Sequence, residues 1–311
     1  MGNRRTIRRF REERRITKLI SFIFIFGGSL FGSGSYEILF FPHDARSLSL
    51  QNSVSAFDSP ILRNNPAALS MHSDGMVYSY LYLPANIHSG EIQRIHRSGK
   101  GIKASRISIL NYGAIIDSKT EDKTYAFDIL LEAGYKKELK NITSVGISGG
   151  YLFSTISGFH SQLLFSNIGI RSRMFRKRMG IGFSLENIGF LLKSYTDVKE
   201  PIPALFRTAL YYKPRHISLI ISGDIVKKLD DDTYYFTTGL EFKPQSRLTI
   251  RLGNSSNRSG YITDDFSSDV LAGFSGGAGF RFTNITLDVG FMNLGPAGLV
   301  VGFSLLKKVD Y

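Results

Sequence analysis

Long stretches of the sequence alternate between apolar and polar residues, and this period of two constrains the fold more than any other feature. The segment NITLDVGF at 284–291 puts Ile, Leu, Val and Phe on one parity and Thr, Asp and Gly on the other. The segments AFDILLEAGY at 126–135, HISLIISGDIV at 216–226 and RLTIRLG at 247–253 follow the same pattern. Side chains of a β-strand point alternately to its two faces, so each segment predicts a strand with one apolar and one polar face.

Two architectures produce such strands. In a soluble sandwich or barrel the apolar face fills a core, whereas in a membrane barrel it faces lipid and the polar face lines the lumen. Several expected strands run ten residues or more, which fits the roughly 9–11 residues of a tilted membrane strand better than the about 5–6 of a globular one. Tyrosines recur near strand ends, as at 78–82, 211–212 and 234–235, where interfacial girdles lie. Together with the basic leader at the start of the chain, these features favour the membrane barrel.

The sequence therefore predicts an all-β fold, a closed antiparallel transmembrane β-barrel of about fourteen strands. An even strand number is the rule for bacterial single-chain barrels. Tight turns are expected at 213–215, 243–245 and 283–284, and longer polar loops at 188–204 and 254–268. The expected strands are 76–83, 88–97, 103–116, 122–136, 142–154, 160–171, 178–187, 205–213, 215–227, 233–243, 246–253, 269–282, 284–293 and 297–306.

The chain begins with a basic segment that carries eight Lys or Arg residues within 4–18, followed by the apolar run LISFIFIFGGSLF at 19–31. This run is too short, at helical rise, for a bilayer core of roughly 30 Å. A basic region, a short apolar run and the small residues at 32–35 are typical of a secretory signal peptide, which we predict for 1–35. An uncleaved anchor is the alternative. The signal peptide explains the basic cluster better than nucleic-acid binding does, and nucleic acid is not an expected partner.

A segment of different character, 36–74, lies between the signal peptide and the first strand. Pro60 and Pro66 would interrupt a strand, and its Ser, Asn and Asp residues favour caps and turns. We expect short helical turns that fill the barrel lumen as a plug. The box Asn65-Pro66-Ala67 predicts a helix boundary capped by Asn65, with a structural role in holding the plug in register. The expected organisation is a signal peptide at 1–35, a plug at 36–74 and a barrel at 75–311.

Several motifs within 43–306 resemble those of the PorV/PorQ family. The Asn65-Pro66-Ala67 box follows a small-residue segment, as it does near the start of family members. Asn167-Ile168-Gly169 stands where the family has Asp-Leu-Gly, and Glu186-Asn187-Ile188-Gly189 where it has Gln-Asn-Leu-Gly. The segment PIPALFRTALYYKP at 201–214 resembles the family's Leu-Pro…Arg…Gly-Leu-x-Tyr element, and GAGFRFTNITLDVGF at 277–291 resembles its penultimate hairpin. The family's glycine-rich Gly-Met-Gly-Gly-Ala run is missing.

This resemblance implies a place among the FadL-like barrels, the long-chain fatty acid transporter type, in the bacterial outer membrane. It also implies an N-terminal hatch inside the barrel. Relatives either carry hydrophobic molecules or act as outer-membrane partners of type IX protein secretion. The expected partners are therefore outer-membrane lipid and either secretion components with exported proteins or a hydrophobic ligand.

The sequence pattern does not indicate an enzyme, and we expect no cofactor and no metal. Gly273 to Gly277 fit the G-x-S-x-G pattern around Ser275, but a nucleophile elbow needs a helix after the serine. Here a glycine-rich strand follows, and no His lies downstream. The six His residues are scattered and Cys is absent, which argues against a zinc site. The run Asp230 to Asp232 predicts a solvated turn, with a loop calcium contact as the alternative.

Ten charged residues fall on positions whose parity points into the lumen. Facing lipid at mid-depth, each Arg or Lys would cost about 2–4 kcal/mol, whereas inside the barrel these charges can pair with one another and with the plug. We favour a salt-bridged lumen that seals the barrel over a selectivity path. The residues are Arg106, Asp128, Glu132, Glu186, Arg207, Asp224, Glu241, Arg247, Arg251 and Asp288.

Four functions are compatible with the sequence. The leading hypothesis is a non-catalytic barrel that serves as a partner in type IX-like protein secretion or surface export. The alternative is a FadL-like transporter of fatty acids or other hydrophobic molecules, in which Phe57, Tyr78 and Tyr80 could line an apolar pocket. An outer-membrane lipase that uses Ser275, and a soluble β-protein held by an uncleaved anchor, are the remaining two.

Overall fold

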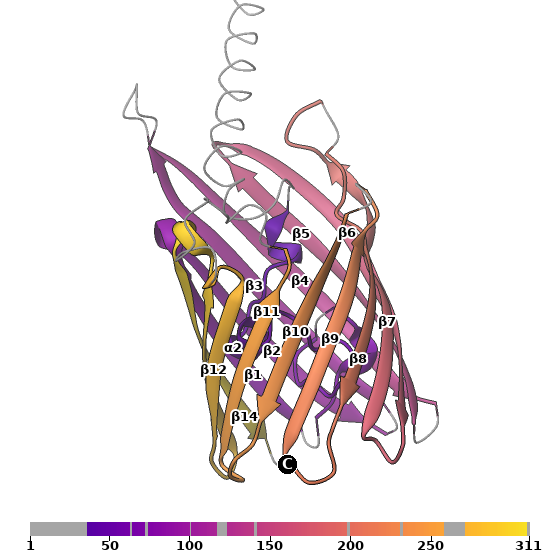
Figure 1. Cartoon of the computed structure of the whole chain (residues 1–311). Helices are drawn as coiled ribbons and strands as arrows, with labels where there is room; N and C mark the ends of the chain where they lie inside the picture. Colours follow the sequence, from indigo (N-terminus) through magenta and orange to yellow (C-terminus); the bar gives the residue numbers. More distant parts are fainter. Residues whose placement is uncertain are drawn as a thin grey trace, which may run out of the picture.

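The described part of the chain folds into one β-barrel of fourteen antiparallel strands (Figure 1), as the computed structural model shows. The closed barrel predicted from the sequence is thereby confirmed. The structure describes residues 36–62, 64–71, 74–99, 101–116, 123–139, 142–197, 200–230, 233–257 and 271–309. The predicted signal peptide at 1–35 and the residues Asp231 and Asp232 lie outside these ranges.

Each strand pairs with its neighbours in the sequence, and β1 pairs with β14 to close the ring. This seam runs from Asp74 opposite Val309 to Tyr82 opposite Val301. Closure satisfies the backbone donors and acceptors between strands and leaves no open sheet edge. The strands are β1 Asp74–Leu83, β2 Ile87–Ser98, β3 Gly101–Ile116, β4 Lys123–Glu138, β5 Thr143–Ile156, β6 Phe159–Met174, β7 Met179–Lys193, β8 Leu205–Tyr212, β9 Leu219–Lys228, β10 Tyr234–Phe242, β11 Leu248–Ser255, β12 Phe274–Arg281, β13 Ile285–Asn293 and β14 Leu299–Val309.

The two rims of the barrel differ in the length of their connections. The connections after β2, β4, β6, β8, β10 and β12 are short, and they form what we call the turn rim, at the bottom of Figure 1. The connections after the odd-numbered strands form the loop rim, whose longest members are 194–204 and 256–273. The 3-10 helices η3 (Pro84–Asn86) and η5 (Gly295–Ala297) also belong to the loop rim. Residues 258–270 lie outside the described part.

The strands bury their polar faces and expose their apolar faces. In β13, Leu287, Val289 and Phe291 are exposed on the outer surface, whereas Asp288 between them is only 9% exposed. The same inversion holds in β1, where Tyr80 is exposed and Ser79 is buried. A water-soluble barrel would show the opposite distribution.

Three strand boundaries differ from the sequence prediction by four residues or more. β7 continues to Lys193, so the expected loop 188–204 is shorter, because the long neighbour β6 pairs with the apolar run that follows Asn187 despite two register shifts. β9 begins at Leu219 rather than 215, and 213–218 form the turn. β12 begins at Phe274 rather than 269.

The N-terminal segment, here residues 36–71, lies inside the barrel (indigo to purple in Figure 1). It contains η1 (Glu37–Leu39), α2 (Ala45–Ser49) and η2 (Pro66–Ala68). Asp44 caps α2 by accepting a hydrogen bond from the backbone N–H of Ser47 at 2.8 Å. Asn65 caps η2 in the same way through the N–H of Ala67 at 3.0 Å, and Pro66 begins the turn. These short elements are therefore capped locally by their own sequence.

Apolar side chains of the N-terminal segment pack against the inner wall in three buried clusters. One contains Phe41 and Leu48 with Leu130 and Leu163 of the wall. A second centres on Leu62 and Met71, and a third on Leu50 and Phe57. Among the described residues, no helix is long and apolar enough to cross a membrane. The N-terminal segment thus has its own apolar contacts to the inner wall.

Candidate functional site

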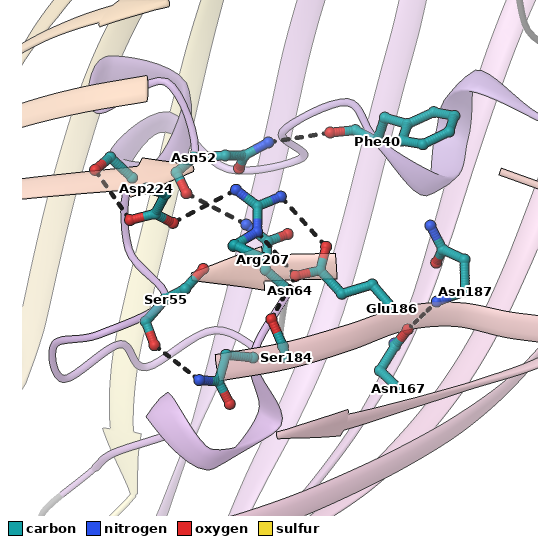
Figure 2. A network of polar contacts seen from close by, with 12 residues as sticks. Phe40, Asn52, Ser55, Asn64, Asn167, Ser184, Glu186, Asn187, Arg207 and Asp224 are labelled. Carbon is teal, nitrogen blue, oxygen red and sulfur yellow. Dashed lines mark hydrogen bonds and ion pairs between the residues drawn. The ribbon is translucent and has the colours of Figure 1, made fainter. Parts of the chain in front are cut away.

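Arg207 of β8 forms the centre of a buried ion-pair network in the lumen (Figure 2). Its Nε lies 2.8 Å from Oε1 of Glu186, and its Nη1 lies 3.4 Å from Oδ2 of Asp224. Ser184 donates to Glu186 at 2.6 Å, and Ser53 of the N-terminal segment donates to Asp224 at 3.3 Å. The network therefore joins β7, β8 and β9 to the segment that fills the lumen.

A second network surrounds Arg106 of β3. Its guanidinium lies 2.8 Å from Glu91 and 2.6 Å from Glu132, and all three side chains are buried. Asn167 of β6 donates to Glu132 at 3.0 Å and accepts from the backbone N–H of Asn187 at 2.7 Å. This network links β2, β3, β4 and β6 to the irregular part of β7 from the inside.

The third network reaches into the N-terminal segment through Arg46 of α2. Glu241 accepts from Nε of Arg46 and from Nε of Arg251, both at 2.9 Å. Arg251 also lies 2.6 Å from Asp288. The guanidinium of Arg46 stacks over the ring of Phe57, with 4.9 Å between its Cζ and the ring centroid. Arg46 thus ties α2 to the wall by charge and to Phe57 of the same segment by aromatic contact.

A fourth network near the turn rim holds the middle of the N-terminal segment. Asp58 lies 2.8 Å from Nη1 of Arg171, and Arg173 lies 3.1 Å from Glu138. Burial favours a raised pKa for Asp58, but the charges of Arg171 and Arg173 outweigh it and hold the pKa of this carboxyl below its ordinary value. The sequence prediction missed this network, although Arg171 and Arg173 share the inward parity of Asn167 in β6.

The structure places nine of the ten charges expected in the lumen on the buried inner face, with Asp128 accepting hydrogen bonds from Ser154 and Tyr112. Arg247 is the exception. It is exposed in the turn before β11, because that strand begins at Leu248 rather than at 246. The expectation for Arg247 was wrong, since parity predicts a face only for residues that are paired within the sheet. The nine are Arg106, Asp128, Glu132, Glu186, Arg207, Asp224, Glu241, Arg251 and Asp288.

Glycines on the inner face of the wall make room for the N-terminal segment on two opposite sides. A Cβ atom at Gly146 of β5 or Gly169 of β6 would overlap with η2 or with its cap Asn65. A Cβ atom at Gly277 of β12 or Gly290 of β13 would overlap with α2. The two contact sites agree with the packing of η2 against β4–β7 and of α2 against β11–β14. The glycines therefore form two cradles for the segment, which the sequence pattern did not reveal.

A pocket of about 120 Å³ lies between the N-terminal segment and the wall, towards the loop rim. Phe40 and Phe41 of the segment and Met292 and Leu294 of the wall supply its apolar side. A cavity of about 150 Å³ is known to hold a benzene molecule, so this pocket approaches the size of a single aromatic ring. Tyr78 and Tyr80, which the sequence suggested as pocket residues, instead point outward from β1, and Phe57 is buried in the third apolar cluster.

Glu37 adds a titratable group to this pocket. Burial raises the pKa of its carboxyl to about 8, against the opposing charge of Lys228, and the charge of Asp128 raises it further. The carboxyl is therefore largely protonated at neutral pH while η1 is docked. The side chain of Asn52 donates to the carbonyl of Phe40 at 3.0 Å (Figure 2). This hydrogen bond connects the residues that follow η1 to Ser53, the next residue after Asn52.

Alkaline pH is expected to weaken the docking of η1. The docked carboxyl keeps its proton up to about pH 8, whereas an undocked one releases it near its ordinary pKa of 4.5, so docking loses free energy as pH rises between these values. The thiol of Ser53→Cys should react faster with a small impermeant reagent at pH 8 than at pH 6. The rates are divided by those of a thiol at the exposed position Ser246→Cys, which corrects for the ionisation of the thiol itself. In a variant that also carries Glu37→Gln, the difference in reaction rate between pH 8 and pH 6 should disappear. If it persists in that variant, Glu37 is not the group that makes docking depend on pH.

Ser275 and the other residues considered for chemistry have structural partners. Ser275 is buried in β12 and donates to the backbone carbonyl of Ser49 at 3.0 Å, and a strand rather than a helix continues after it. Among the described residues, no cluster of three or more His, Cys, Asp or Glu side chains could hold a metal ion. Asp230 lines the loop-rim pocket. The hydroxyl of Ser275 thus contacts α2, at the position that a substrate would occupy if Ser275 were a nucleophile.

Comparison with solved structures finds the same fold in two toluene transporters. The toluene transporter TbuX of Ralstonia pickettii is similar with a TM-score of 0.63 and 11% identity, over 88% of this chain and 99% of that one. The toluene transporter TodX of Pseudomonas putida has a TM-score of 0.59 and 10% identity, over 89% and 98%. A FadL homologue of Pseudomonas aeruginosa has a TM-score of 0.49 and 11% identity, over 91% and 98%. No family model and no curated protein matches the sequence.

Proposed function

We propose that the protein is an outer-membrane transporter of small hydrophobic molecules, which enter through the pocket at the loop rim. The observation that carries this proposal is the pocket itself, a space close to one aromatic ring in size between the N-terminal segment and the wall, with an apolar side formed by Phe40, Phe41, Met292 and Leu294. The likeness of the fold to two toluene transporters supports it. This function was the alternative in the sequence analysis, and the observations favour it over the leading hypothesis.

The exposed apolar faces of the strands support a location in the membrane, and the rims support an orientation. Outer-membrane barrels have short periplasmic turns and longer extracellular loops. The turn rim would then face the periplasm and the loop rim the outside. A ligand from outside would meet the loop-rim side of the pocket, at residues such as Lys228 and Leu294, before it reaches Arg207, which also lines the pocket.

Transport requires the N-terminal segment to act as a plug that moves. The segment fills the lumen and is held on the wall by Arg46, by Asp58 and by the two glycine cradles. A pocket of about 120 Å³ closed below by this segment can bind a ligand but cannot pass it on. Local undocking of the segment, rather than opening of the wall, is the step that this arrangement allows.

A disulfide between the segment and the wall is expected to abolish uptake. The hydroxyls of Ser53 and Ser222 lie 3.0 Å apart, a separation that suits cysteine side chains, and the chain has no other Cys. In bacterial cells whose oxidising periplasm forms the bond, the S53C/S222C variant should take up radiolabelled toluene no faster than cells without the protein, and a reductant should restore uptake.

The matched control joins two strands of the wall. Thr143 of β5 and Ser172 of β6 are cross-strand partners on the outer face with hydroxyls 3.4 Å apart, so T143C/S172C joins two strands and leaves the segment free. Uptake by this variant should equal that of the unmodified protein. Normal uptake by the oxidised S53C/S222C variant would overturn the moving plug, and absence of toluene uptake by the unmodified protein would count against the transport of monoaromatic molecules.

A role as a partner in protein secretion is the second candidate. It is supported by the PorV/PorQ-like motifs alone, among them the Asn65 box, whose capping geometry is compatible with either function. Crosslinking in cells followed by purification would test it. Recovery of secretion components would support this role, and their absence would leave the transporter as the better reading.

A further inference from the structure

The outer surface of the barrel carries a groove that crosses five strands, β2 to β6. Its floor consists of small outward residues that face one another across the strand pairs. Ser105 pairs with Ala133, Ala133 with Gly149, and Gly149 with Ser166. Most outward positions elsewhere in the barrel carry Ile, Leu, Phe or Tyr side chains, which this row lacks.

Rows of large side chains form the two walls of the groove. On the side of the loop rim, Ile107, Leu131, Tyr151 and Leu164 are cross-strand neighbours in turn. On the side of the turn rim, the corresponding row begins with Lys103. The two halves of the groove have volumes of about 740 and 660 Å³ and share its floor. The groove is therefore a continuous trough rather than a set of separate dimples.

The groove has the dimensions of a lipid chain. Four interstrand spacings of about 4.8 Å give it a length of roughly 19 Å. One leaflet of a bilayer contributes about half of a hydrocarbon core of roughly 30 Å. Because membrane strands are tilted by about 45°, a row that runs across them is inclined to the membrane normal as well. An acyl chain that enters at one end can thus lie in the groove along most of its length.

The end of the groove near the turn rim is basic. Arg94 pairs with Ser105 at the end of the floor, and it lies close to the end of β2 at Ser98. Lys103 and His96 pair beside it, and all three side chains point outward. Asp74 is the acidic residue at this position, and it contacts His96. The other end of the floor, Ser166, lies in the middle of β6, so the groove runs from a charged rim towards the centre of the barrel wall.

We propose that this groove binds one phospholipid of the periplasmic leaflet, with its phosphate at Arg94 and Lys103 and one acyl chain along the floor. The assignment rests on the membrane location and orientation in the proposed function, but not on transport. The charge complementarity at the rim and the depth of an apolar trough at the other end both favour a phospholipid.

Two substitutions test the groove separately from the barrel. A Cβ atom at Gly149 would meet only the carbonyl oxygen of Phe165, at 3.8 Å, so Gly149→Phe fills the floor without disturbing the wall. Gly90 of β2 also faces outward, has no neighbour within 4 Å of a Cβ, and lies outside the groove, so Gly90→Phe is its control. Arg94→Glu with Lys103→Glu reverses the charge at the rim.

The full chain and these variants would be reconstituted in nanodiscs of equal parts phosphatidylethanolamine and phosphatidylglycerol, extracted with mild detergent, and weighed by native mass spectrometry. The unmodified protein and Gly90→Phe should retain one phospholipid per barrel. Gly149→Phe should retain about tenfold less, the equivalent of losing contact with two methylene groups. The charge-reversed variant should lose at least about fivefold per residue, from about 1 kcal/mol for each basic side chain.

Equal retention by all four proteins would overturn the lipid site, and so would equal loss from Gly149→Phe and Gly90→Phe. A barrel that fails to insert into the nanodiscs would overturn both this site and the proposed function. Retained phospholipid in a protein that takes up no hydrophobic probe would support the site and overturn the transport proposal alone.

Discussion

Replacing Arg207 with methionine is expected to lower the free energy of unfolding by about 3–5 kcal/mol, because Glu186 and Asp224 then remain buried without their counter-charge. Both carboxylates lie on the inner face of the wall within 3.4 Å of the guanidinium. Methionine keeps most of the volume, so the loss would report the charge rather than a cavity. Urea-induced unfolding from lipid vesicles, followed by the gel mobility of the folded barrel, measures this difference.

Arg247→Met is the matched control for this prediction. Arg247 has the same side chain, but it is exposed in the turn between β10 and β11, so its replacement should change stability by no more than about 0.5 kcal/mol. Adding Glu186→Gln and Asp224→Asn to Arg207→Met should recover part of the loss, since neutral amides cost less to bury than unpaired carboxylates. A loss below 1 kcal/mol for Arg207→Met would mean that water reaches this network.

Replacing Gly169 with leucine is expected to release the N-terminal segment and raise the permeability of the barrel. A side chain at this position would overlap with Asn65, which caps η2 and donates to the carbonyl oxygens of Ser55 and Ile170. Overpacking of about 1–3 kcal/mol would shift the equilibrium between docked and undocked segment by roughly 5- to 150-fold. The swelling rate of proteoliposomes in a small sugar measures the change.

Gly90→Leu provides the comparison, because it adds the same side chain on the outer face, where a Cβ has no neighbour within 4 Å. Its swelling rate should equal that of the unmodified protein. If Gly169→Leu also leaves the rate unchanged while the protein remains folded, the segment does not limit passage through the lumen.

The strands could be predicted because their signal is local. Alternation along AFDILLEAGY or NITLDVGF is a property of a few consecutive residues, and it indicated both the strand and its inner face. The end of β7 could not be predicted, since Ile188 to Leu192 lack alternation and are held as a strand by pairing with β6. The adjacent Leu163 and Leu164, which look irregular in the sequence, face the lumen and the outside respectively.

The content of the lumen was predicted only in part, for a physical reason. Strand parity indicates that Glu132 or Asp224 points inward, but the partner of each charge depends on the register between strands and on the path of the N-terminal segment. Arg46 is separated from Glu241 by 195 residues, and nothing near either residue in the sequence links them. The roles of Gly146 and Gly169 become visible only when η2 lies against them.

The position of α2 has a consequence for how the ring is completed. The backbone N–H of Ala45 donates to the hydroxyl of Ser304 on β14 at 2.9 Å, and that hydroxyl donates to Ser79 on β1, also at 2.9 Å. The seam between the first and last strands is thus bridged from within by the segment that precedes both in the chain. The pairing of the last strand with the first and the docking of α2 therefore share one chain of hydrogen bonds, which runs through Ser304. Loss of the Ser304 hydroxyl would therefore disturb both the seam and the docking of α2.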